Sequence, residues 1–376
     1  MNLQETRNRQ VLGLFLLSVL VSFVVLNRWL VVDAGLRSYG RVWQLYISYE
    51  DFGFIRRGLF GTIFSVSKIN SIFENEYHFS IFAHHVAILV LAVAILVYIK
   101  RSRIDDVPLI ATVFLSPALI IQSGYTTGSL DVFILVLITL NILYVRTTAT
   151  FALVLVMGIL AHELFVFTIP AQLVSHYMSL KAGGEQKPRE KLMIPIIATI
   201  AAITVVSIFG SVNFPRSYVE SIMAEKLPYA AGQHSLWSGY FETSATAAEN
   251  TSWSVYAFFK ELRHAAVFLL IPLLYLVLVT ARLISYSKNK LERLVFVLSA
   301  LCPLLVSFLA ADLYRWIGMS ANVGLLLTLS ILERETGSRS KITFVLLPFS
   351  LLAPFGAAQI DRPFPAQQLI WESLFG

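Results

Sequence analysis

Residues 148–180, TATFALVLVMGILAHELFVFTIPAQLVSHYMSL, decide how many times this chain crosses a membrane. The stretch is apolar on both sides of a polar pair, His162 and Glu163. A perpendicular membrane helix needs roughly 20 residues, so the stretch forms either one long helix or two short helices. In the second case the turn lies at Ala161-His162-Glu163. The positions of the basic residues distinguish the two arrangements.

Basic residues are concentrated in short segments between the apolar runs. These segments lie at 7–9, 100–103, 146, 181–191, 282–293 and 334–341. With two short helices, the chain crosses the membrane about eleven times from a cytoplasmic N-terminus, and these basic segments all face the cytoplasm, as the positive-inside rule requires. One long helix would place the cluster at 181–191 outside and invert every later loop. The sequence therefore predicts two short helices.

The composition excludes an ordinary soluble protein. Hydrophobic residues make up 57% of the 376 residues, charged residues make up 14%, and the mean hydropathy is +0.72. Soluble domains are about 45–50% apolar and about 25% charged. The net charge of +6 does not indicate nucleic acid, because membrane proteins collect Lys and Arg on their cytoplasmic loops. The single cysteine, Cys302, excludes an internal disulfide and a cysteine metal cluster.

These features predict an all-α, polytopic membrane protein with about eleven transmembrane helices. Residues 1–376 form a single membrane-embedded domain with two large outer loops, at 27–80 and 213–264. The first apolar run follows a basic N-terminus and is interpreted as an uncleaved span. The expected spans lie at 11–26, 81–99, 107–122, 130–145, 149–161, 164–178, 192–212, 265–284, 294–311, 317–332 and 342–358.

Ionisable residues at the outer ends of the spans are the candidate functional groups, because charges near a membrane span are costly. Five separate stretches of sequence carry them, and we expect them to meet in one cleft that opens away from the cytosol. They are Glu50, Asp51, Arg56 and Arg57 in the first outer loop, Asp131 beside Tyr125, His162 with Glu163, Asp312 with Arg315, and Asp361 with Arg362.

The first-loop residues each have a structural alternative. Arg56 and Arg57 either anchor an interfacial helix by snorkelling or bind a phosphate through their forked guanidinium groups. Glu50 and Asp51 either pair with these arginines or take part in chemistry. In the second case Asp51 is a general base or a ligand of a divalent metal.

The other candidates also have alternatives. His162 and Glu163 form either a structural pair at a helix end or part of a site. Asp312 and Arg315 are three residues apart and can form an ion pair on one helix face. Asp131 can be the N-cap of the fourth span. Asp361 and Arg362 are interpreted as loop charges.

Several well-known site motifs are excluded. In His162-Glu163-Leu164-Phe165-Val166, valine stands where a zinc protease helix needs its second histidine. The chain has no Walker phosphate-binding loop, no dinucleotide fingerprint and no serine nucleophile elbow.

The arrangement resembles the polytopic glycosyltransferases of the GT-C superfamily. The resemblance rests on the acids Glu50-Asp51 in a long first outer loop, on short central spans with polar outer turns, and on a large later outer loop. The segment Gly158–Pro170, GILAHELFVFTIP, is similar to the central helical hairpin of that superfamily. The resemblance implies a polyprenyl-phosphate or polyprenyl-diphosphate sugar donor, used at the outer face of the membrane.

Metal-dependent members commonly have two acids separated by one residue in the first loop, whereas Glu50 and Asp51 are adjacent. With the arginines, this favours a metal-independent enzyme similar to O-antigen and polysaccharide polymerases. No cofactor is then expected, and a bound divalent metal is the alternative.

The resemblance also implies roles for the candidate residues. Arg56, Arg57 and Arg315 would bind the departing diphosphate, and Tyr125 and Asp131 would contact substrate. Asp51, or Glu163 with His162, would take the proton of the attacking hydroxyl. Glu50 and Asp312 are also candidate catalytic residues.

The expected partners are the lipid-linked donor, a glycan or lipid-linked acceptor, and membrane lipid, with no nucleic acid. The expected location is a bacterial inner membrane with the active site in the periplasm. The rival interpretations are a lipid or glycolipid transporter, whose polar groups usually lie near the bilayer midplane, and a membrane-bound acyltransferase.

Overall fold

The computed structural model describes residues 3–32, 42–102, 104–116, 118–119, 129–210, 214–228, 270–308, 313–333 and 341–352. Every regular element in these ranges is a helix, so the prediction of an all-α fold is confirmed for them. The longer α-helices are α1 (Leu3–Val32), α4 (Glu76–Arg101), α6 (Asp131–Leu143), α7 (Thr148–Ala161), α8 (Ile169–Ala182), α9 (Pro188–Phe209), α10 (Arg216–Lys226), α13 (Lys290–Leu301), α14 (Leu313–Leu332) and α15 (Lys341–Leu352). An unlabelled helix spans Leu270–Ile284. The short helices are η1 (Val42–Leu45), α2 (Tyr49–Phe52), α3 (Gly58–Val66), η2 (Ile69–Ile72), α5 (Val107–Leu115), η4 (Glu163–Thr168) and η6 (Cys302–Phe308).

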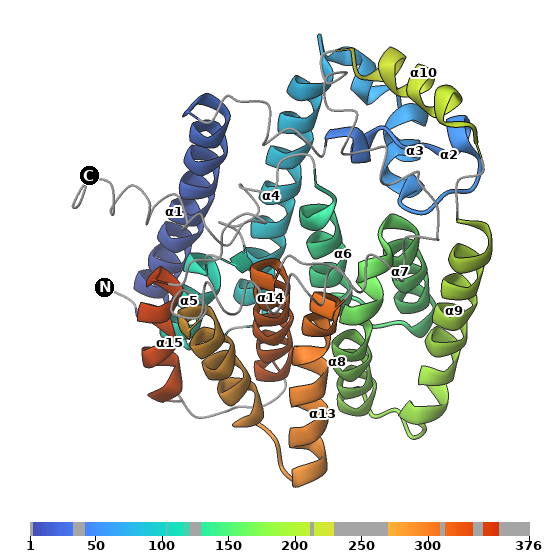
Figure 1. Cartoon of the computed structure of the whole chain (residues 1–376). Coiled ribbons are helices and arrows are strands. Elements are labelled where there is room, and N and C mark those ends of the chain that lie inside the picture. The colour runs from blue at the N-terminus through green and yellow to red at the C-terminus, as the bar shows by residue number, and fades with distance from the viewer. Residues whose placement is uncertain are drawn as a thin grey trace.

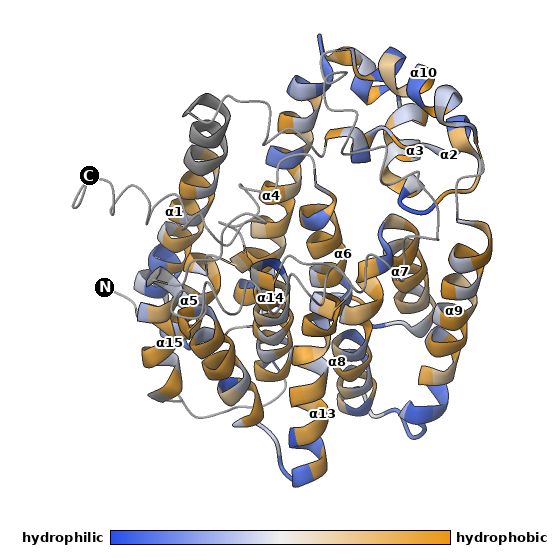
Figure 2. Ribbon diagram, viewed as in Figure 1, coloured by the Kyte–Doolittle hydropathy of each residue, from blue (hydrophilic) through white to orange (hydrophobic). Residues whose placement is uncertain are grey.

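Some of the described helices have the length and composition of membrane spans, and the figure of about eleven spans stays a prediction. Four segments of the described chain are long and apolar enough to cross a membrane, namely Glu76–Arg101, Pro188–Phe209, Lys290–Phe308 and Arg315–Leu332. Shorter apolar helices accompany them. Figure 2 shows hydrophobic helices between two hydrophilic ends, with α10 at one end and the start of α13 at the other. This pattern is typical of a membrane protein.

The helices form one packed assembly around α4, α6, α8 and α14 (Figure 1). On one side, α1 packs on α4 and α5, and α15 packs on α5. On the other side, α7 packs along α9, whose outer face is strongly apolar. Ile197, Ile200 and Ile208 of α9 are each about 60% exposed, as expected for side chains that contact lipid.

Within the predicted first outer loop, 27–80, the structure describes residues 27–32 and 42–80. Helix α1 continues to Val32 and α4 already begins at Glu76. Between them η1, α2, α3 and η2 fold back over the ends of the other helices. Gly61 of α3 allows this packing, because a Cβ atom there would lie 1.9 Å from the carbonyl oxygen of Ile47.

Part of the second outer loop packs against the first. Residues Arg216–Lys226 of this loop form α10, and the loop residues 229–264 lie outside the described ranges. Helix α10 buries Val219 and Met223. Tyr218 Oη donates a 3.2 Å hydrogen bond to the carbonyl oxygen of Asp51. The described parts of the two loops therefore form one cap at one end of the helices.

The stretch 148–180 forms the predicted helical hairpin. Helix α7 ends at Ala161, and α8 begins after the single 3₁₀ segment η4. The two helices are antiparallel, because the Phe151 and His176 rings stack with centroids 4.1 Å apart near the base. At the turn, Gly158 leaves room for the Phe165 ring, which a Cβ atom would meet at 2.4 Å.

Buried polar side chains join α6, α8 and α14 below this turn. Asn141 Nδ2 donates to Gln172 Oε1 at 2.7 Å, and Gln172 Nε2 donates to Thr168 Oγ1 at 2.8 Å. Deeper in the bundle, the hydroxyl oxygens of Ser175 and Ser330 lie 2.7 Å apart. Interhelical hydrogen bonds of this kind hold helices together where the surroundings are apolar.

Two ionic contacts lie at the opposite end of the helices. Arg146 Nη2 bonds Glu333 Oε2 at 2.6 Å, and Tyr98 Oη donates to the same oxygen at 2.9 Å. Arg282 Nη2 lies 3.1 Å from Asp106 Oδ2, with both side chains less than 10% exposed. These contacts join loops that the sequence places in the cytoplasm.

Candidate functional site

The hairpin turn presents Glu163 to the first outer loop. Arg57 Nε lies 3.1 and 2.9 Å from the two carboxylate oxygens of Glu163, and Arg57 Nη2 also bonds Oε1. The guanidinium thus binds the carboxylate through two nitrogens, and such bidentate pairs are among the strong ones. The Arg57 and Glu163 side chains are 18% and 33% exposed, so water still reaches the pair.

The backbone around Arg57 is held in an uncommon conformation. Arg57 has φ of +62°, in the left-handed region that side chains with a Cβ rarely adopt. It lies directly before α3, and the backbone N–H of Arg56 donates to the carbonyl oxygen of Gly210 at 3.0 Å. Strained residues of this type concentrate at functional sites. From this backbone position the Arg57 guanidinium contacts Glu163 at the hairpin turn.

A second ion pair lies beside the first. Arg315 Nη2 bonds Asp131 Oδ1, and the two side chains are 12% and 14% exposed. The Arg315 guanidinium also lies over the Trp316 ring, with its central carbon 4.7 Å from the ring centroid. Stacking on an aromatic face is a favourable contact for a guanidinium group. Asp131 begins α6 and Arg315 lies in the first turn of α14, so the pair joins the ends of two helices.

His162 lies at the turn, outside both hairpin helices, and is 2% exposed. Its Nδ1 accepts a 3.2 Å hydrogen bond from the backbone N–H of Leu164 and lies 3.4 Å from Glu163 Oε2. Burial and the positive charge of Arg57 lower the pKa of His162 to about 3, with a smaller opposing effect from Glu163. Arg315 and Asp131 also act on it electrostatically. At neutral pH the ring is therefore uncharged, with its proton on Nε2.

Glu163 is a carboxylate at neutral pH. Its packing in the turn acts to raise the pKa of Glu163, but the positive charge of Arg57 outweighs this effect. The hydrogen bonds from Arg57 and the charge of Arg56 act in the same direction. The pKa of Glu163 therefore lies far below its usual range. While Arg57 holds it, Glu163 is a weak base.

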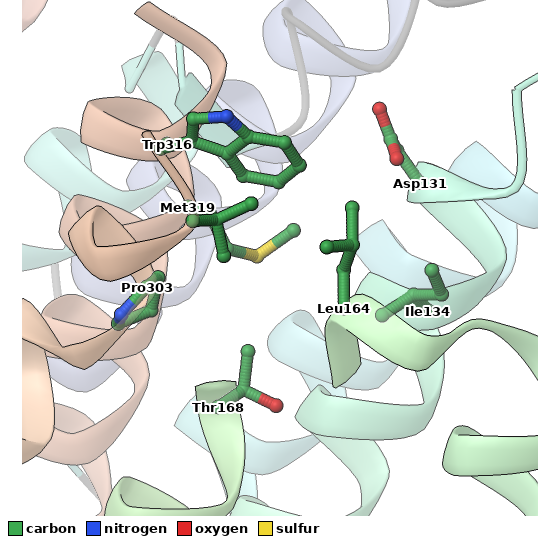
Figure 3. Close-up of a pocket in the computed structure, with 8 residues that line it drawn as sticks. Asp131, Ile134, Leu164, Thr168, Pro303, Trp316 and Met319 are labelled. Carbon is green, nitrogen blue, oxygen red and sulfur yellow. The ribbon is translucent and has the colours of Figure 1, made fainter. Parts of the chain in front are cut away.

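A small cavity lies directly under the second ion pair. Figure 3 shows Trp316, Met319 and Pro303 on one side of it, opposite Asp131 and Leu164, with Thr168 below. Its volume is about 10 Å³, which is about the space of one water molecule. The cavity lies between Asp131 and the hairpin turn, and it has no room for a sugar ring.

The structure brings together five of the predicted residues, Arg57, Asp131, His162, Glu163 and Arg315. Arg56 lies near enough for its charge to lower the pKa of Glu163. These residues come from four of the five stretches expected to meet. We call the five residues the ionic cluster.

The two first-loop acids have partners other than the expected arginines. The Asp51 carboxylate pairs with Lys226 of α10 and bonds the hydroxyl of Ser48. Glu50 Oε2 accepts a 2.6 Å hydrogen bond from Ser65. The interpretation that Glu50 and Asp51 pair with Arg56 and Arg57 is therefore wrong for the contacts described. Asp51 joins the two outer loops instead.

Other predictions need correction or fall outside the described residues. Asp131 is not an N-cap, because Leu130 holds that position and the Asp131 carboxylate is turned to Arg315. The expected partner of Arg315 was Asp312, which lies outside the described residues. Tyr125, Asp361 and Arg362 also lie outside them.

The sequence analysis did not identify some residues that contribute to the site or support it. No sequence pattern identifies Lys226 as the partner of Asp51, because the two residues are 175 positions apart. Ser48 precedes Tyr49-Glu50-Asp51 and receives the backbone N–H of Asp51, an N-cap arrangement that the sequence does suggest. Thr168 follows the hairpin turn and lines the cavity.

Among the residues that the structure describes, no group of three or more His, Cys, Asp or Glu side chains is placed to hold a metal ion. Comparison with protein-family models, with curated proteins and with solved structures finds no match to this chain. The function is therefore argued from the geometry of the cluster.

Proposed function

We propose that the protein is a membrane glycosyltransferase, or polysaccharide polymerase, of the GT-C type. It transfers a sugar or glycan from a polyprenyl-(di)phosphate donor to an acceptor hydroxyl. The observation that carries the proposal is the convergence of Arg57, Arg315, Asp131, Glu163 and His162 at one end of apolar helices. Ionisable groups in this position mark functional sites in membrane proteins.

The proposed setting is a bacterial inner membrane that the chain crosses eleven times, with a cytoplasmic N-terminus. The antiparallel hairpin supports this topology, because it puts the ionic cluster at the end of α7 and α8 opposite the basic segment 181–191. The cluster and the two outer loops then face the periplasm. A donor carried by a lipid would present its diphosphate at that depth.

In the proposed reaction, the oxygen of the acceptor hydroxyl attacks the anomeric carbon of the donor sugar. The bond from that carbon to the diphosphate oxygen breaks, and the diphosphate leaves with the electron pair. Arg57 and Arg315 stabilise the negative charge that grows on the leaving group, an effect that is large in a partly dehydrated site. No metal is needed in this scheme, because guanidinium groups supply the positive charge.

The ion pairs suggest how the base becomes available. The diphosphate competes with Glu163 for Arg57. When Arg57 binds the diphosphate, Glu163 loses the contact that lowers the Glu163 pKa most. Glu163 then accepts the proton of the acceptor hydroxyl. His162, with its proton on Nε2, acts as a hydrogen-bond donor beside it. The base is thus activated only when the donor is bound.

A lipid or glycolipid transporter is the second candidate. The observation that favours it is the set of buried polar residues between α6, α8 and α14, which includes Asn141, Gln172 and Ser175. Transporters bind their substrates near the middle of the bilayer. These side chains are, however, bonded to one another, and the ionisable groups lie at the helix ends. The enzyme is therefore the better-supported candidate.

The test uses the purified full chain in liposomes with a labelled polyprenyl-diphosphate oligosaccharide and an acceptor glycan. Arg57→Ala and Arg315→Ala should lower product formation about 100-fold or more, because each removes a group that stabilises the leaving diphosphate. Arg57→Lys should lose most of the activity too, because an ammonium group cannot form the fork.

The matched control is Arg9→Ala, which removes an exposed arginine that pairs only locally with Glu5 among its described contacts. Its product yield should equal that of the wild type. Wild-type product from folded Arg57→Ala and Arg315→Ala proteins would refute the diphosphate role. Transport of the labelled lipid without any new glycosidic bond would favour the second candidate, and addition of a chelator tests the metal-independent scheme.

A further inference from the structure

A second cavity, separate from the ionic cluster, lies between α3, α4 and α6. It is a groove of about 230 Å³ whose described lining is entirely apolar. The lining comprises Phe60, Phe64, Ile69, Phe79, Phe82, Ala83, Val86, Ala87, Val90, Phe133, Val136 and Leu137. Without a polar side chain in its wall, the groove suits a hydrocarbon.

The groove has the length of half a bilayer. On α4 its lining runs along one helix face from Phe79 to Val90, which corresponds to a rise of about 16 Å. The hydrocarbon core of a bilayer is about 30 Å thick, so the groove extends through about one leaflet. It begins near the start of α4, which belongs to the same end of the molecule as the outer loops.

The groove is open on the side that faces lipid. Phe82, Val86 and Val90 are each 43% exposed, whereas Ala83 and Ala87 at its floor are 6% exposed. The inner wall is made of interlocking rings, with Phe60 and Phe133 centroids 5.0 Å apart. Phe64 also packs edge-on against Phe133. The aromatic wall is therefore fixed by packing, and the small alanines leave the space.

Both helices that supply the aromatic wall begin at the ionic cluster. Arg57 immediately precedes α3, three positions before Phe60, and Asp131 is the first residue of α6, two positions before Phe133. Near the cluster the structure describes the guanidinium groups of Arg56, Arg57 and Arg315 beside the carboxylates of Glu163 and Asp131, while His162 is uncharged. A lipid lying along the groove would thus place an anionic headgroup beside these guanidinium groups.

We propose that this groove binds the isoprenoid chain of the lipid-linked donor, with the phosphates at the ionic cluster. The inference rests on the proposed function for the identity of the lipid. The open side lets the chain enter from the outer leaflet without leaving the hydrocarbon. The bulky aromatic wall favours a chain that is itself broadened by methyl branches.

The experiment uses the full chain in nanodiscs with a polyprenyl phosphate that carries a photoreactive diazirine in its second isoprene unit. After irradiation, mass spectrometry should find the probe on peptides of α3, α4 or α6. Ala83→Phe, which fills the floor of the groove, should lower this labelling about tenfold. Leu89→Phe is the matched control, because Leu89 lies on the same helix, is 43% exposed and does not line the groove.

Competition decides the chemical class of the occupant. An excess of unlabelled polyprenyl phosphate should abolish labelling, whereas the same excess of phosphatidylglycerol should leave it. Label on other helices, equal competition by phosphatidylglycerol, or full labelling of folded Ala83→Phe would each overturn the proposal. If Ala83→Phe does not fold, the position of the wild-type label and its competition still decide.

A parallel transfer assay separates this proposal from the proposed function. If the probe labels the groove of the wild-type protein and no glycosidic bond forms, the lipid site is supported and the transferase is refuted. If transfer occurs and the label lies outside the groove, the transferase is supported and the lipid site is refuted. For an active enzyme, Ala83→Phe should raise the KM for a long-chain donor and leave that for a short-chain donor unchanged.

Discussion

His162 is a buried, uncharged side chain in a turn that is otherwise rich in charge. Its Nδ1 accepts the backbone N–H of Leu164, which makes it the cap of η4. Protonation on Nδ1 would break this bond and add a positive charge beside Arg57. The histidine therefore couples the stability of the turn to pH.

We predict that the free energy of unfolding falls as the pH drops below about 6.5 and that His162 accounts for part of the loss. The unfolded chain binds a proton on this ring near pH 6.5, whereas the folded chain does so only near pH 3. Between pH 6.5 and 4.5 this difference amounts to about 2 kcal/mol. Thermal unfolding of the purified protein in detergent measures it.

The comparison variant is His162→Asn, because an asparagine oxygen can still accept the backbone N–H of Leu164. Its stability should change less with pH over the same range, since its side chain does not titrate. Parallel pH profiles for the two proteins would show that His162 is not the group responsible.

At this scale the sequence predicted which residues lie together better than it predicted how they pair. His162, Glu163, Asp131, Arg57 and Arg315 were recognisable because charged and polar groups are rare at the ends of apolar segments. Their pairing was not recognisable, because Arg57 and Glu163 are 106 positions apart and no periodicity links them. Partners across such distances are determined by helix packing.

The hairpin is the element that positions the site. It places Glu163 at its turn, and the turn segment η4 packs so closely on α7 that Gly158 has no space for a side chain beside Phe165. The sequence predicted this element from the distribution of basic residues. The contact between Gly158 and Phe165 depends on the angle of the turn, and the sequence does not specify that angle.

Gly158→Ala should destabilise the protein by about 1–3 kcal/mol, because the added methyl group overlaps the Phe165 ring. The higher helix propensity of alanine offsets about 1 kcal/mol at most. Thermal unfolding in detergent measures the change. Gly183→Ala is the matched control, since its Cβ atom would meet no atom closer than 3.4 Å.

The double variant Gly158→Ala/Phe165→Leu tests the cause. A smaller side chain at 165 should recover part of the stability lost in Gly158→Ala, so the two changes should not be additive. Strict additivity would place the cost of Gly158→Ala elsewhere in the turn.

The whole molecule has two chemically different ends. One end carries the cap of outer loops and the ionic cluster, and the other carries the Asp106–Arg282 and Arg146–Glu333 contacts. Composition predicted the apolar helices between the ends, and the sidedness that the basic segments indicate stays a prediction. Composition and the basic segments did not predict how α10 docks on the first loop, because Lys226 and Asp51 are far apart in the chain.

Cysteine labelling tests the polarity in cells. In a Cys302→Ser background, cysteines placed at Glu163 and Lys187 should react with a membrane-impermeant maleimide from opposite sides. Both positions are accessible, with the native side chains 33% and 69% exposed. Reaction of both from the same side would show that α8 does not cross the membrane, and the cluster would lose its proposed location.

The brevity of the hairpin arms has a mechanical consequence for the surrounding bilayer. Helices α7 and α8 have 14 residues each, which gives about 21 Å of length, whereas the neighbouring α9 with 22 residues reaches about 33 Å. Hydrocarbon about 30 Å thick matches α9 and exceeds the length of α7, so we expect lipids beside α7 to tilt or compress. We therefore expect the membrane to be thinner over the turn, which would bring lipid headgroups closer to it.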